Sequence, residues 1–283
     1  MTDGDPASAE LTSRTPKVAV TIAGTDSGGG AGVAADLRTF AALGVFGTLV
    51  VTAVTAQNTL GVREFFPVPP AMVAAQLDAV LDDLPVRAAK TGMLATSAVV
   101  ELLASRAAAG LLPPLVVDPV LVASSGKPMF EKDDVAGAYR DLFAWSVVVT
   151  PNLPEAELLT GRRIADLEAM EVAARELQGL GPRLVIVKGG RRRDTEAVDV
   201  AFDGRSVTLL RAPWVETPNV HGTGCTFSAA IAANLALGLE PLAAALLAKG
   251  FVTRAIRGGS KWHLGAGHGP LDQLGAAALD PRA

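Results

Sequence analysis

Cysteine is almost absent from this chain of 283 residues, which contains only Cys225. One cysteine cannot form an internal disulfide, and lone thiols are typical of a reducing cytosol, so we expect a cytoplasmic protein. An excess of basic residues is also absent, because 25 lysines and arginines stand against 29 acidic residues and give a formal net charge of −4. That balance argues against a nucleic-acid partner.

No stretch of the sequence has the uninterrupted apolar character of a membrane span. The most apolar region, residues 225–247, contains Asn234 and Glu240, and its many alanines predict two closely packed, buried helices instead. Residues 1–16 are polar and have no apolar core, so we interpret them as a disordered tail rather than a signal peptide. We therefore expect no membrane partner.

Short apolar runs rich in β-branched residues alternate with segments of helical character. The predicted strands are residues 18–24, 48–54, 87–93, 115–120, 146–152 and 183–190. Helices are predicted between them, at residues 34–44 and near residues 70–84, 97–109, 131–143 and 166–179. The runs lack polar alternation, which is typical of parallel strands covered on both faces.

This alternation predicts a three-layer α/β/α sandwich with a mostly parallel central sheet. A hairpin turning at Asp203-Gly204 follows the last parallel strand, and two Ala-rich helices and a Gly-rich tail close the chain. The sequence has no stretch typical of a domain linker. We therefore expect residues 17–283 to form a single domain.

Polar residues follow several predicted strands, at the sheet edge where such folds bind ligands. Asp118 follows the run LVV, and Lys188 ends the run LVIVK, where it supplies a charge suited to phosphate. Asn152 and Glu155 lie in TPNLPEAELL, residues 150–159. Their amide and carboxylate suit Mg²⁺ held through water, but an N-cap with a first-turn acid explains them equally well.

Cys225 lies in the segment HGTGCT, which precedes a long helical run. Residues Gly222, Thr223, Gly224 and Cys225 would then present backbone N–H groups at a helix N-terminus, which carries about half a positive charge. This arrangement predicts an anion hole for a transferring phosphoryl group. The same field predicts a lowered pKa for Cys225, although a lone cysteine is more often a small buried apolar residue.

A second glycine cluster occupies residues 28–32, within AGTDSGGGAGVAAD. It matches a loose dinucleotide-binding pattern through Gly30, Gly32 and Ala35, but the acidic residue expected about 20 positions later is missing. A flexible turn remains an alternative. Asp36 either caps the next helix or turns its carboxylate toward the ligand.

The remaining polar candidates carry weaker signals. The three histidines lack the spacing of metal ligands, although His221 is placed to shape the anion loop. Residues 191–194, RRRD, are typical of a solvated loop.

In order, these motifs resemble the ribokinase superfamily, and within it the hydroxymethylpyrimidine/phosphomethylpyrimidine kinases of thiamine biosynthesis. The resemblance runs from Val18 to about Leu271 and rests on TIAGTDSGGGAG, AQNTLGV, TGML, TPNLPEAELL, VKGG and HGTGCT. It implies a ribokinase-like fold, a homodimer, ATP and Mg²⁺. The implied reaction phosphorylates 4-amino-5-hydroxymethyl-2-methylpyrimidine and then its monophosphate.

The resemblance also implies roles for particular residues. Cys225 stands where most of the superfamily has an aspartate general base, beside the anion hole. The residues implied to contact the aminopyrimidine are Gly24, Asp36, Gln57, Met93 and Val120. Lys188, Asn152 and the segment after Cys225 are expected at ATP, and Asp118 and Glu155 near Mg²⁺. Val220 replaces a threonine common in the family, and Val33-Ala34 replaces Ile-Gln, without touching a proposed catalytic group.

Four other functions remain open. A pyridoxal kinase is the nearest, because enzymes of similar sequence can accept both rings. A sugar or nucleoside kinase fits less well, since cysteine replaces the aspartate. A nicotinamide-dependent oxidoreductase depends only on the loose glycine pattern, and a non-catalytic ligand sensor would use the same scaffold.

Overall fold

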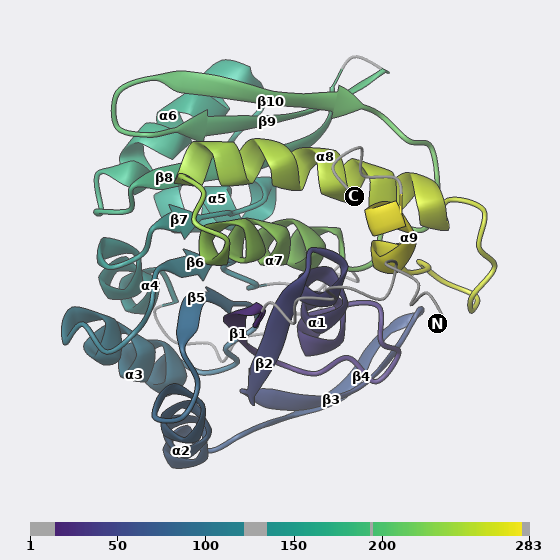
Figure 1. Ribbon diagram of the computed structural model, residues 1–283. Coiled ribbons are helices and arrows are strands. Elements are labelled where there is room, and N and C mark those ends of the chain that lie inside the picture. Colours follow the sequence, from purple (N-terminus) through teal and green to yellow (C-terminus); the bar gives the residue numbers. More distant parts are fainter. Residues whose placement is uncertain (1–14, 122–134, 193–194, 279–283) are drawn as a thin grey trace, which may run out of the picture.

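An eight-stranded sheet forms the centre of the structure, a computed structural model that describes residues 15–121, 135–192 and 195–278 (Figure 1). The strand order is β10-β9-β8-β7-β6-β5-β1-β2. The strands are β1 (Lys17–Ala23), β2 (Val45–Val51), β5 (Val86–Thr91), β6 (Leu115–Val117), β7 (Val148–Val149), β8 (Leu184–Arg192), β9 (Glu196–Phe202) and β10 (Val207–Pro213). The strands from β2 to β8 in this order are parallel, whereas β9 and β10 are antiparallel. The predicted parallel sheet and hairpin are confirmed.

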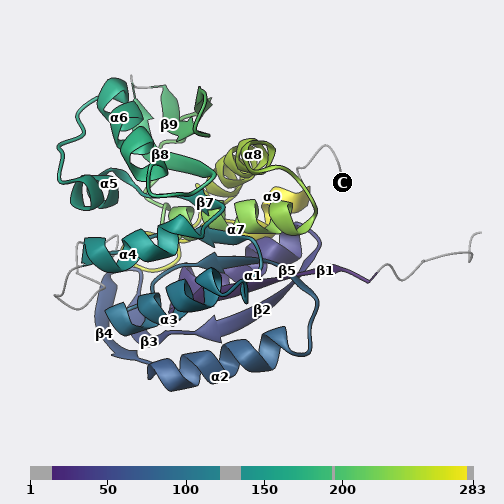
Figure 2. The same cartoon turned by 90° about the vertical axis from the view of Figure 1, so that its left-hand side faces the viewer.

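Two layers of helices cover the two faces of the sheet (Figure 2). One layer contains α1 (Gly32–Ala42), α7 (Thr223–Ala236), α8 (Pro241–Gly259) and α9 (Gln273–Ala278). The other contains α2 (Pro70–Leu81), α3 (Ser97–Ala108), α4 (Val135–Ala144), α5 (Leu153–Thr160) and α6 (Leu167–Gln178). None of the described helices is both long and apolar enough to cross a membrane.

The central strands β1, β6 and β7 are largely apolar because side chains on both of their faces are buried. Successive side chains of a strand point to opposite faces, so Val116 packs in the α7–α8 core while Leu115 and Val117 pack on the other side. Residues 1–14 of the predicted tail, 131–134 of a predicted helix and 193–194 of the predicted loop lie outside the described residues.

A small antiparallel pair was not predicted. β3 (Ala53–Asn58) and β4 (Gly61–Pro67) form a separate two-stranded sheet after β2 (Figure 1). Their segment mixes polar and apolar residues because the ribbon is only partly covered. It therefore lacks the continuous apolar run that marks the central strands.

The Gly-rich C-terminal segment is packed against the loop before α7 and against the β3–β4 turn. Asn219, in the loop before α7, donates its two amide hydrogens to the backbone oxygens of Gly259 and Trp262, both at 2.8 Å. The backbone N–H of His268 donates to the oxygen of Thr59 in the β3–β4 turn, at 3.0 Å. The segment thus joins two loops that are far apart in sequence.

We predict that Asn219→Ala lowers the free energy of unfolding by about 1–3 kcal/mol, because two carbonyl groups lose their buried donor. Urea denaturation measures the change. His263→Ala is the control, since that side chain is exposed and its loss should cost less than about 0.5 kcal/mol. Equal stability of the two variants would contradict the bridging role.

Candidate active site

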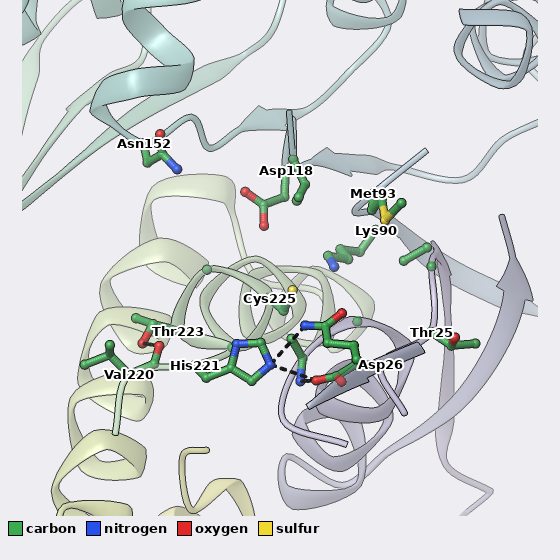
Figure 3. Close-up of a pocket in the computed structure, with 18 of the residues that line it drawn as sticks. Thr25, Asp26, Lys90, Met93, Asp118, Asn152, Val220, His221, Thr223 and Cys225 are labelled. Carbon is green, nitrogen blue, oxygen red and sulfur yellow. Dashed lines mark hydrogen bonds and ion pairs between the residues drawn. The ribbon is translucent and has the colours of Figure 1, made fainter. Parts of the chain in front are cut away.

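A pocket of about 210 Å³ opens at the carboxyl ends of β1, β5 and β6, beside the N-terminus of α7 (Figure 3). It is lined by every predicted site residue except Asp36, namely Gly24, Gln57, Met93, Asp118, Val120, Asn152, Glu155, Lys188, Gly222, Thr223, Gly224 and Cys225. Pockets for drug-sized ligands span roughly 300–1,000 Å³. This one therefore suits a single small ring and not a dinucleotide.

Helix α7 begins where the sequence predicts, with Gly222 as its N-cap. Gly222 has φ +89°, and a Cβ there would collide with the backbone oxygen of Gly30, so only glycine fits this close approach. No side chain in the described structure caps the helix. The N–H groups of its first turn, at Gly224 and Cys225, therefore remain available beside the pocket.

The predicted low pKa of Cys225 is wrong. Burial raises the pKa of this thiol to about 11. Lys90 acts against the rise, the carboxylates of Asp36 and Asp118 add to it, and the N–H of Gly32 opposes it. The prediction weighed only the helix field, which here does not compensate for the loss of solvent.

Asp36 lies beneath the pocket instead of lining it, which corrects its expected contact with the ligand. Its side chain is fully buried, and Oδ2 accepts hydrogen bonds from Thr21 Oγ1 at 2.6 Å and from Lys90 Nζ at 2.8 Å. Lys90 is equally buried but does line the pocket. Lys90 was not among the predicted site residues, although a lysine inside the apolar run RAAKTGM needs a charged partner when it is buried.

A second ion pair, between a partly buried lysine and a buried aspartate, lines the same pocket. Lys188 Nζ is 2.7 Å from Asp118 Oδ1, and Asp118 also accepts hydrogen bonds from Thr150 at 3.2 Å and Ser228 at 3.3 Å. Burial opposes the charge of Lys188, but Asp118 and Glu155 attract it and raise its pKa overall. The positive charge is therefore firmly held.

Asn152 and Glu155 form a capping box at the start of α5, as one interpretation of TPNLPEAELL predicts. The Glu155 N–H donates to Asn152 Oδ1 at 2.9 Å, and the Asn152 N–H donates to Glu155 Oε2 at 2.8 Å. Glu155 is only 3% exposed. Burial raises its pKa to about 7, with Lys188 opposing the rise and Asp118 adding to it.

A metal would find an incomplete ligand set here. Asp118 and Glu155 offer the oxygen donors that Mg²⁺ prefers, and both line the pocket. In the described ranges, no three histidine, cysteine or acidic side chains cluster as a metal site. These two carboxylates therefore suit an ion that keeps several waters or binds phosphate oxygens as well.

The first glycine loop is organised around Asp26, a polar residue after the first predicted strand to which the sequence assigned no role. Asp26 accepts hydrogen bonds from the N–H groups of Gly28 and Gly30 at 2.9 Å and of Ala31 at 2.8 Å. Burial would raise the pKa of Asp26, but hydrogen bonds from His221 and Ala31 outweigh it and lower the pKa. Because these N–H groups are already bonded, they are not available for a dinucleotide pyrophosphate.

His221 connects this loop to the anion-hole segment. Its Nε2 lies 2.8 Å from Asp26 Oδ2 and 3.4 Å from Gln57 Nε2 (Figure 3). His221 was predicted to shape the anion loop. It does so by linking that loop to Asp26 and Gln57, which also line the pocket.

A second cavity, of about 350 Å³, adjoins the first between β9, β10, α7 and α8. Lys188, Val220 and Thr223 line both cavities. The second is more apolar, with Val215, Phe227, Val252 and Ile256 among its lining residues. The cation Lys188 thus lies where a polar site meets an apolar one.

Known proteins resemble this chain over most of its length. The family described as phosphomethylpyrimidine kinase matches residues 26–272. A hydroxymethylpyrimidine/phosphomethylpyrimidine kinase from Synechococcus elongatus is 49% identical over 255 residues, which are 90% of this chain and 96% of that protein.

Two solved structures extend the likeness to the fold. A pyridoxal kinase from Bacillus subtilis, in complex with ADP, superposes with a TM-score of 0.84 and 36% identity over 94% of this chain and all of that one. A phosphomethylpyrimidine kinase from Clostridium difficile 630 has a TM-score of 0.74 and 37% identity over 84% of this chain and 99% of that one.

We predict that Glu155→Gln flattens the pH dependence of stability between about pH 4.5 and 7. The folded state binds the Glu155 proton more tightly than the unfolded state, whose pKa is near 4.5. The wild-type protein should therefore lose stability as the pH rises through this window, and the variant should be the more stable above pH 7.

Chemical denaturation at several pH values in metal-free buffer measures this effect. Glutamine keeps the oxygen that caps α5, so the helix start is preserved. Glu168→Gln, at an exposed first-turn glutamate of α6, is the matched control and should keep the wild-type slope. The same slope in the Glu155 variant would argue against the raised pKa.

Proposed function

The chain belongs to the phosphomethylpyrimidine kinase family, and from this premise we propose that it uses ATP to phosphorylate 4-amino-5-hydroxymethyl-2-methylpyrimidine and then the resulting monophosphate. One observation carries the proposal. A small polar pocket and an apolar cavity meet at Lys188 and at the uncapped N-terminus of α7. Such a junction suits a phosphoryl group that passes between two bound molecules.

The aminopyrimidine would occupy the smaller pocket. Met93 and Val120 belong to one apolar cluster and offer surfaces for the ring, with Gly24 beside Met93. The amide of Gln57 can donate and accept hydrogen bonds, as the mixed edge of an aminopyrimidine requires. Asp36 is not among the proposed contacts, because it lies below the lining.

ATP would place its adenine in the apolar cavity and extend its phosphates toward Lys188, Asn152 and the anion hole. The charge of Lys188 and the free N–H groups of the first turn of α7 would then face the transferring group. Asp118 and Glu155 would hold Mg²⁺ together with waters and phosphate oxygens. When bound, Mg²⁺ neutralises charge on the phosphates.

Cys225 is proposed as the proton acceptor in the first phosphorylation. The thiolate takes the proton of the hydroxymethyl group, and the oxygen forms a bond to the γ-phosphorus of ATP. The bond from that phosphorus to the β,γ-bridging oxygen breaks, and ADP leaves with the electron pair. The backbone N–H groups of residues 222–225 stabilise the charge that develops.

Pyridoxal kinase is the second candidate activity. The similar Bacillus subtilis pyridoxal kinase supports it, but the closer sequence match to the pyrimidine kinases favours the first. The nicotinamide-dependent alternative loses its support, because the glycine loop bonds to Asp26 and the pocket is small. No feature of the pocket favours a sugar or nucleoside kinase or a non-catalytic sensor.

We also propose that the kinase is a cytoplasmic homodimer. Strand β2 ends the large sheet, and apolar side chains on β2, β3 and β4 are exposed. They are Phe46, Leu49, Val54 and Phe66. An exposed apolar surface of this kind supports self-association. The cytoplasmic location stays a prediction from the lone cysteine.

An ATP-coupled assay tests the activity. The aminopyrimidine, its monophosphate and pyridoxal are each supplied with ATP and Mg²⁺, and the products are identified by mass. We expect the pyrimidine monophosphate to form first and the diphosphate to follow. Faster turnover of pyridoxal would assign the second candidate activity, and no turnover of any alcohol would favour a sensor.

Cys225→Ala should slow the first phosphorylation by about 10²- to 10⁴-fold, the usual cost of losing a general base, and leave substrate affinity nearly unchanged. The second phosphorylation should suffer less, because its acceptor is already ionised. Rates with the alcohol and with the monophosphate, measured on the same preparation, give the comparison. Near-full activity with the alcohol would rule out the base role.

A further inference from the structure

A buried ion pair beneath Cys225 has no part in the reaction as described so far. Lys90 and Asp36 are both fully buried, and Lys90 Nζ lies 2.8 Å from Asp36 Oδ2. Burying two charges is costly even when they pair, so an apolar pair would serve a purely structural purpose as well or better. The position of this pair at the pocket suggests a chemical role.

We propose that Lys90, held by Asp36, is a positioning residue that stabilises the thiolate of Cys225. The proposal rests on the proposed role of Cys225 as proton acceptor. A base must be deprotonated, and a nearby positive charge favours the deprotonated sulfur. The sequence attributed this charge to the helix N-terminus, whereas the proposal attributes it to Lys90.

The geometry directs the ammonium toward the sulfur. Lys90 lies near the carboxyl end of β5 and lines the pocket, and its side chain points toward Cys225 (Figure 3). An ammonium has three N–H donors, and Asp36 is its one acceptor among the described residues. The remaining donors are therefore free to face the pocket and the sulfur.

Several negative groups together keep Lys90 charged in a place without solvent, so its charge does not depend on Asp36 alone. Burial opposes the charge, but Asp36, Cys225 and Asp118 raise the pKa of Lys90 overall. Asp36 is fixed in turn by Thr21 Oγ1 at 2.6 Å on β1, so the ammonium has a defined position. Lys90 is therefore held as a cation near the sulfur of Cys225.

The same groups explain the raised pKa of the Cys225 thiol. Cys225 is faced by Lys90 from β5, by Asp36 from α1 and by Asp118 after β6, with Lys188 beyond Asp118. Lys90 lowers the pKa of the thiol, whereas burial and the two carboxylates raise it. Removal of Lys90 and removal of the Asp36 charge must therefore have opposite effects on the sulfur.

This opposition makes the proposal testable without any assay of activity. Cys225 is the only cysteine, so alkylation by the neutral reagent iodoacetamide reports on this thiol alone. Well below its pKa, the alkylation rate is proportional to the fraction of thiolate. One nearby charge typically shifts a pKa by about 1–3 units.

We expect Lys90→Met to slow alkylation of Cys225 at pH 8.5 by about tenfold or more, and Asp36→Asn to accelerate it by about tenfold. A structural role would move both variants in one direction. The double variant removes both charges together, so it should fold even where Lys90→Met does not, and should alkylate more slowly than Asp36→Asn alone. Lys249→Met breaks the buried pair with Asp199 elsewhere and should leave the rate unchanged.

The outcomes separate this proposal from the base role. Shifts in the same direction, or no shift, would overturn the assignment of Lys90 even if Cys225→Ala is inactive. Opposite shifts, with Lys90→Met slowing the alcohol far more than the monophosphate, would support it. Full activity of Cys225→Ala would remove the base role and the catalytic part of this proposal together.

Discussion

The contact between the two glycine loops is the constraint on which the site depends. The loop after β1 and the loop before α7 approach so closely that Gly222 has no room for a side chain beside the Gly30 backbone. The contact between Asp26 and His221 holds the two loops together. Asn219 connects the second loop to the C-terminal segment through a hydrogen bond to Gly259. The pocket lies between these loops, so its walls come from both ends of the chain.

Two lysine–aspartate pairs then distribute charge around the pocket. Lys188 with Asp118 lies at the junction with the apolar cavity, where phosphates would be bound. Lys90 with Asp36 lies close enough to Cys225 to influence the charge of its sulfur. Each carboxylate helps to keep its lysine charged in a site with little solvent. Lys188 faces the position proposed for the phosphates, and Lys90 faces the sulfur that is proposed to be negative before it accepts the proton. The fold therefore holds both positive charges in defined positions.

The residues that line the site were largely predictable, because chemistry and position in the strand pattern coincide for them. Lys188 and Asp118 end or follow apolar runs, and the carboxyl ends of parallel strands meet at one edge. The prediction for Asp36 was wrong because a side chain in the first turns of a helix can face either the ligand or the core. Only the packing of the folded protein decides which of the two it faces. Lys90 and Asp26 were assigned no role for a related reason: their partners, Asp36 and His221, are distant in sequence.

The sequence by itself determined the layered architecture, the start of α7 and the family, and it offered the capping box at Asn152 as one of two interpretations. These features depend on local patterns, such as apolar runs, glycine at tight turns and side chains that cap their own helix. Only the tertiary structure decided the pairing of β3 with β4, the packing of the C-terminal segment and the pKa of Cys225. Pairing and packing depend on partners that are remote in the chain. A pKa depends on how much solvent the assembled protein excludes and on which charges it brings near.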